Sequence, residues 1–508
     1  MSQILDGDIV VLTDHSIRTV SQNHTLWNED LRPCTREEHN WSGMRFASLW
    51  IGMCICLPSY SLASGMIELG MSWWEAVLTV FIGSCIVLIP ILYVSHAGTK
   101  FGIPYPVFAR LWFGNRGAHI PALARAVSAA GWFGINCWFG ALALDAILGH
   151  VIPGWTSFGI HLGISFIVFW LLNLLIAARG AQAIGKLAAL VSPLFIVGSI
   201  VLLIWAVTHA GGFAHLLSAP AKVHGLAFWA VFYPSVIGVI AFWATMALNI
   251  PDFTRYAKSQ RGQTIGQLIS MPLTMALFSF VGIAVTSGTV ILYGQALWNP
   301  VDLIVKFPTP IVIIAGIVVI LSSITINVGA NVVAPARAFE NLWPRKINFA
   351  IGAIITGILA LAMQPWYVLA HFSTYLFNWL GTLGILLGPF DGIAIADYWL
   401  VRSRKLDLLQ LYTVNGRYDY SKGFNVRALY ALIIGWAIVL LGLIIPGLHF
   451  LWTGGWLFGI LGGLFGYWAL MKGEKSVLSD LEYSHITQFV SDDLNFPLAS
   501  VSGTMSDK

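Results

Sequence analysis

The stretch WIGMCICLPSYSLASG, residues 50–65, places a proline in the middle of a long apolar segment. Pro58 lacks a backbone N–H, and its ring clashes with the carbonyl one turn earlier, so a helix through this stretch should break. Gly52 and Gly65 flank the expected break. The backbone groups that a break frees inside a membrane need other partners, so this stretch predicts an irregular, polar point within an apolar helix.

The whole chain has the composition of a membrane protein. Of its 508 residues, 57% are hydrophobic and only 10% are charged, and the mean hydropathy is +0.78. Soluble domains carry roughly 25% charged residues. Apolar runs of about 20 residues can cross the hydrocarbon core as helices, which satisfy their own backbone groups. The short alternating strands of a barrel are not evident, so the predicted fold class is an all-α integral membrane protein.

The apolar runs predict twelve spanning helices, numbered here in chain order: 45–67, 74–95, 121–148, 158–177, 187–209, 227–250, 267–292, 310–336, 348–364, 371–399, 428–446 and 452–471. The weakest separator is QPWYVLAHF, between helices 9 and 10. The chain then divides into a polar tail, a ten-helix core, a loop, two additional helices and a second polar tail: 1–44, 45–399, 400–427, 428–471 and 472–508. Both tails are expected to be solvated, and the first lacks the pattern of a cleavable signal peptide.

Positive charge is distributed unevenly between the two sides of the predicted bundle. Of the 27 lysines and arginines, all but three lie in the tails or in the loops after even-numbered helices. Lys222 and Lys306 lie on the other side, and Arg125 lies inside the start of helix 3. Because basic loops remain in the cytoplasm, we expect both termini there and the protein in the inner or plasma membrane.

A second interruption is expected in helix 6, five helices after the first. The stretch VFYPSVIGVIAFWATMALNIP, residues 231–251, contains Pro234, Gly238 and Pro251. Two broken helices at corresponding places indicate an inverted repeat of five plus five helices, a design used by many secondary transporters. The alternative is a pair of ordinary proline kinks.

Polar side chains recur in apolar helices near these two points. In GWFGINCW, residues 131–138, Trp132 and Asn136 are four apart and share a helix face, with Arg125 on the same stripe. Such an amide is either a contact between helices or a contact to a ligand. In helix 6, Trp243 lies in mid-span rather than in an interfacial belt, and Asn249 follows it.

Helix 8 has the densest group of polar side chains. Ser323, Asn327 and Asn331 follow at intervals of four, and Ser322 and Thr325 form a neighbouring stripe. Helix packing rarely needs so many polar side chains, so this group favours a cavity lined by them. Amides beside tryptophans complement a neutral planar ring with an –NH–CO–NH– edge. The acids near or within the helices are candidates for coupling or for local pairing: Glu68, Glu75, Asp145, Asp391 and Asp397.

Enzyme chemistry is not indicated. The chain has five cysteines, which is an odd number, and most of them lie in apolar segments. No disulfide framework is therefore expected. There is no HExxH motif, no mid-membrane pair of histidines and no nucleophile–base pattern. No cofactor is predicted.

Seven motifs, taken together, resemble the type-1 nucleobase–cation symporter family over residues 28–470. They are NEDLRP at 28–33, HAGTKFGIPYPVFAR at 96–110, GWFGINCWFGALALD at 131–145, NIPDFTRY at 249–256, ANVVAP at 330–335, DYWLVR at 397–402 and YDYSKGFN at 418–425. The resemblance implies a LeuT-like 5+5 inverted repeat plus two C-terminal helices. It also implies import of cytosine, uracil, allantoin or a hydantoin by cation symport, with helices 3, 4, 8 and 9 moving against helices 1, 2, 6 and 7.

The resemblance also assigns residues to a site. Those implied to contact substrate are Trp132, Asn136, Trp243, Phe242, Asn331 and Cys56. Those implied to hold Na⁺ are the backbone oxygens of Gly52, Ile55 and Ser322 and the hydroxyl of Thr325. Asn136 stands where the family often has the longer glutamine, which suggests a ligand larger than a plain hydantoin or rotated in the site. Ile326 stands where a second hydroxyl is expected, so Ser323, a water or proton coupling remain alternatives. A passive facilitator is the second functional hypothesis, and a membrane enzyme is the third.

Overall fold

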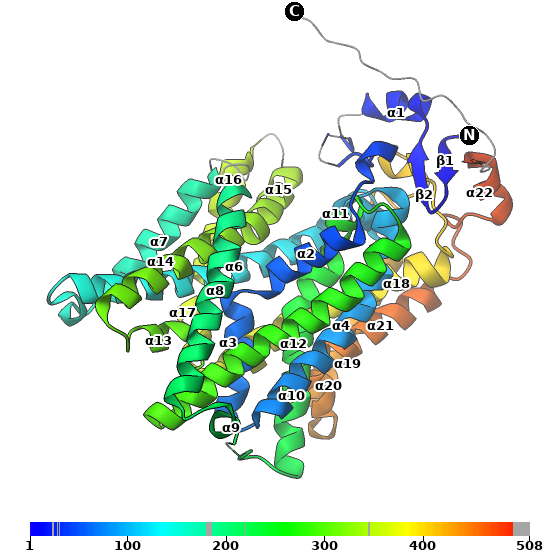
Figure 1. Ribbon diagram of the computed structural model, residues 1–508. Helices are drawn as coiled ribbons and strands as arrows, with labels where there is room; N and C mark the ends of the chain where they lie inside the picture. The colour runs from blue at the N-terminus through cyan, green and yellow to red at the C-terminus, as the bar shows by residue number, and fades with distance from the viewer. Residues whose placement is uncertain are drawn as a thin grey trace, which may run out of the picture.

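The protein is described as a computed structural model of residues 1–490, apart from residues 23–24, 28, 30, 179–184, 219 and 344–345. Within the described residues, seven helices are long and apolar enough to cross a membrane, or nine if each of two bent pairs is one span. Three shorter apolar helices fall on predicted helices 4, 5 and 9. The predicted all-α fold is therefore confirmed for the membrane-spanning part of the chain (Figure 1).

The helices follow the predicted order. Helices 1 to 6 are α2 with α3 (Gly43–Cys54, Leu57–Glu68), α4 (Trp73–Phe101), α6 (His119–Val151), α7 (His161–Ala178), α8 (Gly185–His209) and α10 (Leu226–Asn249). Helices 7 to 9 are α12 (Gln260–Tyr293), α14 with α15 (Thr309–Ile326, Val333–Leu342) and α16 (Phe349–Ala362). Helices 10 to 12 are α18 (Gly381–Ile395), α19 (Val426–Ile444) and α21 (Gly455–Leu470). Short helices α5 (Tyr105–Phe113), α9 (Phe213–Leu216), α11 (Pro251–Thr254), α13 (Pro300–Ile304), α17 (Pro365–Val368) and α20 (His449–Thr453) lie in the connections.

The predicted break in helix 1 is present. α2 and α3 meet at 59°. Ile55 and Cys56 leave the helical region, and Pro58 lies at the start of α3, where a missing N–H costs nothing. The Cys56 N–H donates to the Cys54 carbonyl at 3.1 Å. The Gly52 carbonyl thereby loses the donor that a continuous helix would supply.

The predicted break in helix 6 is not present, because α10 runs without interruption through Pro234. Gly238 serves close packing instead: a Cβ there would lie 2.2 Å from the side chain of Leu376. The chain turns only after Asn249, where Pro251 begins α11. Helix 8 carries an unexpected irregularity, a π-helical segment η4 (Asn327–Val332) between α14 and α15.

The helices pack as two groups. α6 packs on α7, α14, α15 and α16, and these five form the first group. α12 packs on α2, α3 and α4, and α10 packs on α4, forming the second group. α18, α19 and α21 pack together, with α18 against α10. Figure 1 shows the first group on the left and the second in the centre.

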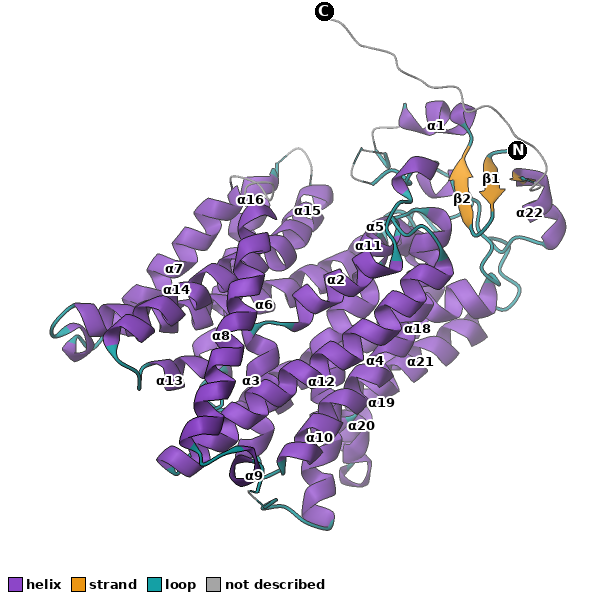
Figure 2. Cartoon of the chain, viewed as in Figure 1, coloured by secondary structure: helices purple, strands orange, loops and turns teal. Residues whose placement is uncertain are grey.

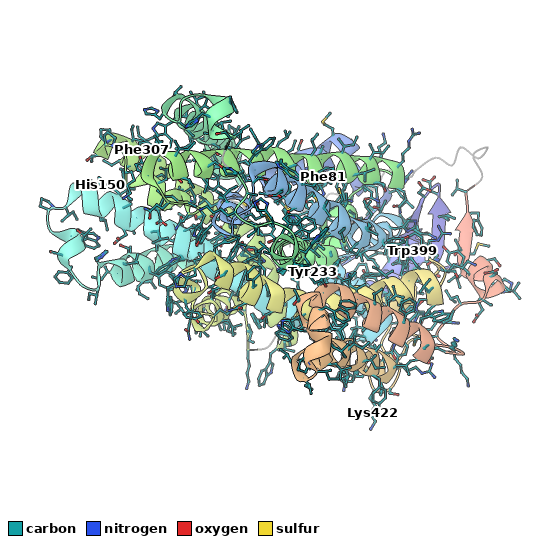
Figure 3. All side chains as sticks on the ribbon, turned by 90° about the horizontal axis from the view of Figure 1, so that it is seen from below. Phe81, His150, Tyr233, Phe307, Trp399 and Lys422 are labelled. Carbon is teal, nitrogen blue, oxygen red and sulfur yellow. The ribbon has the colours of Figure 1, made fainter. Side chains whose placement is uncertain are left out.

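The two polar tails form structure that the sequence reading did not anticipate. Strands β1 (Gln3–Asp6), β2 (Ile9–Leu12) and β3 (Thr487–Phe489) form one sheet in the order β2-β1-β3, shown in orange in Figure 2. Helices α1 (Asp14–Ser21) and α22 (Asp480–Ile486) flank it. The N-terminal and C-terminal strands pair directly and in parallel. Figure 3 places Trp399 towards this tail end of the bundle and His150 at the far end.

Candidate functional site

Aromatic side chains from three helices meet near the break. The Trp132 ring on α6 makes edge-to-face contacts with Phe242 on α10, at 4.8 Å between centroids, and with Trp379, at 4.7 Å. Phe242 in turn contacts Trp243 at 5.1 Å. The two predicted tryptophans therefore share one cluster but do not face each other, because Phe242 lies between them.

Trp379 is an aromatic contact that the sequence reading missed. It lies on η5 (Thr374–Leu380), a π-helical segment before α18, and stacks on Tyr375 at 5.8 Å. The sequence did contain a signal for this contact, because Tyr375 and Trp379 are two aromatic residues four apart in helix 10. In this conformation the Phe242 and Trp379 rings lie at 74° and 86° to the Trp132 ring, so neither is stacked parallel to it.

Asn136 directs one polar atom to its own helix and leaves the other unpaired. Its Nδ2 donates to the Trp132 carbonyl at 3.0 Å. Its Oδ1 is buried and has no hydrogen-bond partner among the described residues, and the residue is only 1% exposed. A buried acceptor without a donor costs roughly 1–3 kcal/mol. Asn136 therefore offers one buried acceptor a helical turn after Trp132.

A chain of amides extends from the predicted Asn331. Its Nδ2 donates to Asn327 Oδ1 at 3.1 Å, which confirms that the two share a stripe. Asn327 Nδ2 lies 3.2 Å from Asn173 Oδ1 on α7 and 3.3 Å from the Phe133 carbonyl on α6. Asn173, a lone amide in apolar helix 4, was overlooked. These bonds hold Asn331 at the irregular η4 segment, 7% exposed.

The proposed cation ligands lie on two separately packed helices. Gly52 and Ile55 belong to the break in the second helix group, where Gly52 is exposed and a Cβ would meet nothing within 4 Å. Ser322 and Thr325 belong to α14 in the first group, where the Thr325 hydroxyl donates to the Ser322 carbonyl at 2.9 Å. Carbonyl and hydroxyl oxygens are the donors that such transporters offer to Na⁺, so the residues fit by type.

Two residues next to the proposed cation ligands add no further ligand oxygen. Ile326 supplies no oxygen. The Ser323 hydroxyl is buried and, among the residues that the structure describes, has no partner; it lies four residues before Asn327, which faces α6 and α7. Residues four apart share a face, so Ser323 points along the amide stripe and not toward the break. Cys56 lies at the start of α3, and its Sγ is 3.1 Å from the Ser59 hydroxyl.

Most of the predicted acids have local partners. Asp397 and Arg402 form a fully buried ion pair at 2.9 Å. Asp145 accepts hydrogen bonds from Trp155, His161 and Ser165 near the far end, and Glu75 caps α4. Asp391 accepts one bond from Trp456 at 3.2 Å, and its other oxygen has no partner within the described ranges of the chain. No group of three or more metal-ligating side chains was found among the described residues.

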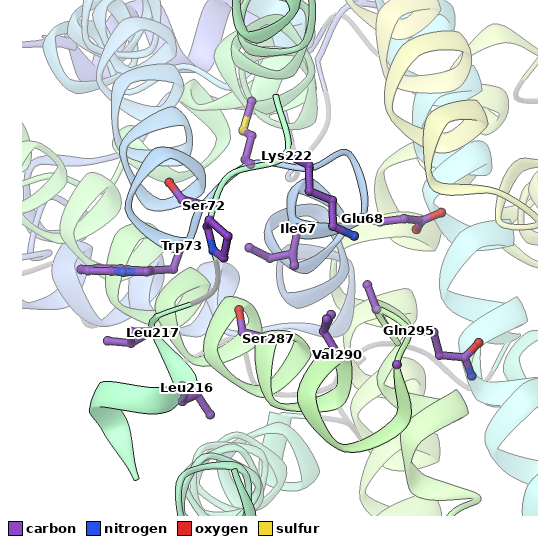
Figure 4. Close-up of a pocket in the computed structure, with 15 residues that line it drawn as sticks. Ile67, Glu68, Ser72, Trp73, Leu216, Leu217, Lys222, Ser287, Val290 and Gln295 are labelled. Carbon is purple, nitrogen blue, oxygen red and sulfur yellow. The ribbon is translucent and has the colours of Figure 1, made fainter. Parts of the chain in front are cut away.

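A cavity of about 150 Å³ opens at the far end, away from the predicted site. Figure 4 shows its lining, which includes Ile67 and Glu68 of α3, Trp73 of α4, Lys222 and Gln295. Glu68 therefore lines this far-end cavity.

Comparison with known proteins points to one class. Residues 33–470 match the family model described as a permease for cytosine/purines, uracil, thiamine and allantoin. A purine-uracil permease of Arabidopsis thaliana is 42% identical over 84% of this chain and 72% of its own length. An allantoin permease of Bacillus subtilis is 39% identical over 89% of this chain and 94% of its own length.

Solved structures show the same fold. A nucleobase-cation-symport-1 family transporter, 24% identical, matches in its inward-facing conformation with a TM-score of 0.78, over 92% of this chain and 99% of that one. Its closed conformation with bromovinylhydantoin bound matches with a TM-score of 0.72, over 91% of this chain and 99% of that one.

Proposed function

Because the chain belongs to the family of permeases for cytosine, purines, uracil, thiamine and allantoin, we propose that it imports a neutral ring of the nucleobase or ureide type together with a cation. It is a multi-pass membrane transporter of the secondary active kind and not an enzyme. The candidate rings are uracil, cytosine, allantoin and a hydantoin.

The observation that carries this proposal is the unpaired Oδ1 of Asn136. It is buried one helical turn after Trp132, and it can accept a hydrogen bond from a ring N–H. Asn331 supplies a second amide from η4, and Phe242 and Trp243 supply apolar faces from α10. One acceptor, one amide and several rings match a planar imide or ureide, and no fixed charge among them calls for a charged ligand.

The coupling ion that we propose is Na⁺, held by the carbonyls of Gly52, Ile55 and Ser322 and the Thr325 hydroxyl. The break at Cys56 supports this, because it frees the Gly52 carbonyl from the helical ladder. The Thr325 hydroxyl would have to turn from its own helix to take part. Since these ligands come from both helix groups, ion binding would draw the groups together. Proton coupling is the alternative that the single hydroxyl favours.

We propose that the tail end faces the cytoplasm of the inner or plasma membrane. Both tails lie at that end, where their strands pair, and nearly all lysines and arginines belong to the tails or to the loops on that side. Transport then follows when the two helix groups move relative to each other and expose the site to alternate sides.

The test of the site is Asn331→Ala, which should abolish uptake of radiolabelled uracil or allantoin while the protein is expressed normally. Asn378→Ala is the matched control, because this amide also lies in a spanning segment but is exposed. Unchanged uptake kinetics in Asn331→Ala would show that the assignment is wrong.

Substrate and ion can be assigned with the protein's own tryptophans. Quenching of their fluorescence by allantoin but not uracil, or the reverse, identifies the ring class, and repeating the titration with and without Na⁺ identifies the ion. Accumulation of the ring above its outside concentration separates a symporter from a passive facilitator, which can only equilibrate it.

A further inference from the structure

A second contact joins α6 and α10 two turns from the Trp132–Phe242 contact. Arg125 lies seven residues before Trp132, and Asn249 lies seven residues after Phe242. Arg125 Nη2 donates to Asn249 Oδ1 at 3.3 Å when the amide is oriented so that its nitrogen donates to the Thr245 carbonyl. The interface between the two helix groups is thus aromatic at the site and polar nearer the tail end.

Two of the three nitrogens of the Arg125 guanidinium have no partner among the described residues in this conformation. The residue is 7% exposed, and its Nε and Nη1 are buried without a partner in the part of the chain that the structure describes. A buried charge with unpaired donors is costly unless a partner completes it. A partner should therefore reach these donors in another conformation of the protein.

Asp252 is positioned to be that partner. Ile250 keeps helical geometry between α10 and α11, so Asn249 and Asp252, three residues apart, lie on one face. Asp252 is half-buried, and its Oδ1 accepts the backbone N–H of Tyr105 at 2.8 Å. Arg125 and Asp252 interact electrostatically, yet within the described part of the chain they make no direct ion pair.

The two residues belong to different helix groups. Arg125 lies on α6 in the first group, and Asp252 lies on α11, which packs on α4 of the second group. Their separation must therefore change when the groups move. Near the break, Gly52 is exposed in this conformation, so a side chain placed there would meet no other described part of the protein.

We propose that Arg125 and Asp252 form an inner latch, an ion pair that closes when the tail side of the site closes and is parted here. The inference rests on the proposed movement of the two groups, but not on which ring or ion is carried. The latch would make up for the guanidinium donors left unpaired in the open state. Without it, the open state is favoured.

The reporter for this test is Gly52→Cys, whose thiol should react with a maleimide only while the tail side is open. The protein with its native cysteines alone sets the baseline. Arg125→Met and Asp252→Asn should each raise the labelling rate about tenfold in the absence of ring and added cation, as loss of one buried charge pair shifts a two-state equilibrium. The double variant should label no faster than either single one.

Controls separate a latch from a structural role. Arg110→Met removes another buried arginine, one bonded to the Leu26 and Leu411 carbonyls, and should leave the labelling rate unchanged. If single variants fail to fold, the charge reversal Arg125→Asp with Asp252→Arg should restore both a normal melting temperature and the parent labelling rate.

Two results would overturn the latch. One is additive effects of the two single variants, or none, on labelling. The other is a loss of ring binding in Arg125→Met but not in Asp252→Asn with labelling unchanged, which would make Arg125 a ligand contact. Because labelling needs no substrate, an absence of uptake by the parent protein would contradict the proposed function without deciding this test.

Discussion

Asn136 combines two roles that the sequence could only offer as alternatives. Its nitrogen bonds its own helix, as a structural amide does, while its oxygen is buried and unpaired, as a ligand contact requires. The spacing of Trp132 and Asn136 predicted that they share a face, and the structure agrees. Spacing could not predict how the amide is oriented, because that depends on which neighbours fill the space around it.

Lengthening this side chain should change which ring is preferred. Asn136→Gln moves the acceptor about one C–C bond toward the ring position, so it should favour a small hydantoin over allantoin. We expect the ratio of the two KM values to shift by about fivefold, the value of one hydrogen bond of about 1 kcal/mol. Uptake of both labelled rings by the same cells measures it. An equal rise in KM for both rings would mean that Asn136 does not determine which ring is preferred.

A second residue-scale prediction concerns stability. Asp397 and Arg402 are both fully buried, and the guanidinium also bonds Tyr420 and Ser476. Asp397→Asn should lower the free energy of unfolding by about 3–5 kcal/mol, because it leaves a buried cation unpaired. The melting temperature in detergent reports this loss. Glu29→Gln, which removes the exposed partner of Arg32, is the control and should change stability by less than about 1 kcal/mol.

Among the elements, the two prolines that seemed equivalent in the sequence differ in the structure. Pro58 begins α3 after a real break, whereas Pro234 lies inside an unbroken α10. Pattern alone could not separate them, because tertiary packing decides whether a proline-containing helix stays continuous. The sequence pattern also did not predict the π-helical segments Asn327–Val332 and Thr374–Leu380, although it identified some of the residues that they contain as candidate site residues.

Pro58→Ala should reduce uptake strongly, and Pro234→Ala should not. An interior proline costs a helix about 3 kcal/mol, so removing Pro58 lowers the barrier to a continuous helix and lets the Gly52 carbonyl regain its helical donor. The cation dependence of uptake at matched expression measures the effect. Equal behaviour of the two variants would show that the break does not depend on Pro58.

At the scale of the whole molecule, the lengths of the apolar segments and the placement of the charges were enough to predict the order of the helices. The lipid bilayer constrains both. The joining of the tails was missed, although Gly7-Asp8 between two alternating stretches is a hairpin signal. Gly7 has φ +59°, the conformation such a turn needs. The third strand comes from residues 487–489, and no local pattern predicts a partner so distant in the chain.

Acid should loosen the N-terminal tail. The hydrogen bond from Arg32 lowers the pKa of Glu38 to about 2, from an ordinary value of 4.5. A folded-state pKa below the unfolded one stabilises above pH 4.5, and this stabilisation is lost as the pH falls toward 2. Pepsin should therefore cut the tail faster at pH 2.5 than at pH 4. Glu38→Gln should be cut readily at both values, and a pH step that persists in this variant would exclude Glu38 as its cause.

Gln3 should hold both tails to the bundle at once. It is fully buried; its Nε2 donates to the Leu406 carbonyl at 3.2 Å and to Thr487 at 2.9 Å, and its Oε1 accepts the Leu408 N–H. Gln3→Ala leaves these buried groups unpaired, at roughly 1–3 kcal/mol each.

Because β1 is the central strand, this loss should be felt on both of its sides. Hydrogen exchange should therefore quicken together in residues 9–12 and 487–489, whereas Thr19→Ala, at an exposed hydroxyl on α1, should change neither. Faster exchange confined to one tail would mean that the two tails dock separately. Faster exchange in both tails would show that the two ends of the chain are held as one unit against the loop between helices 10 and 11. A change in one tail must then also affect the other.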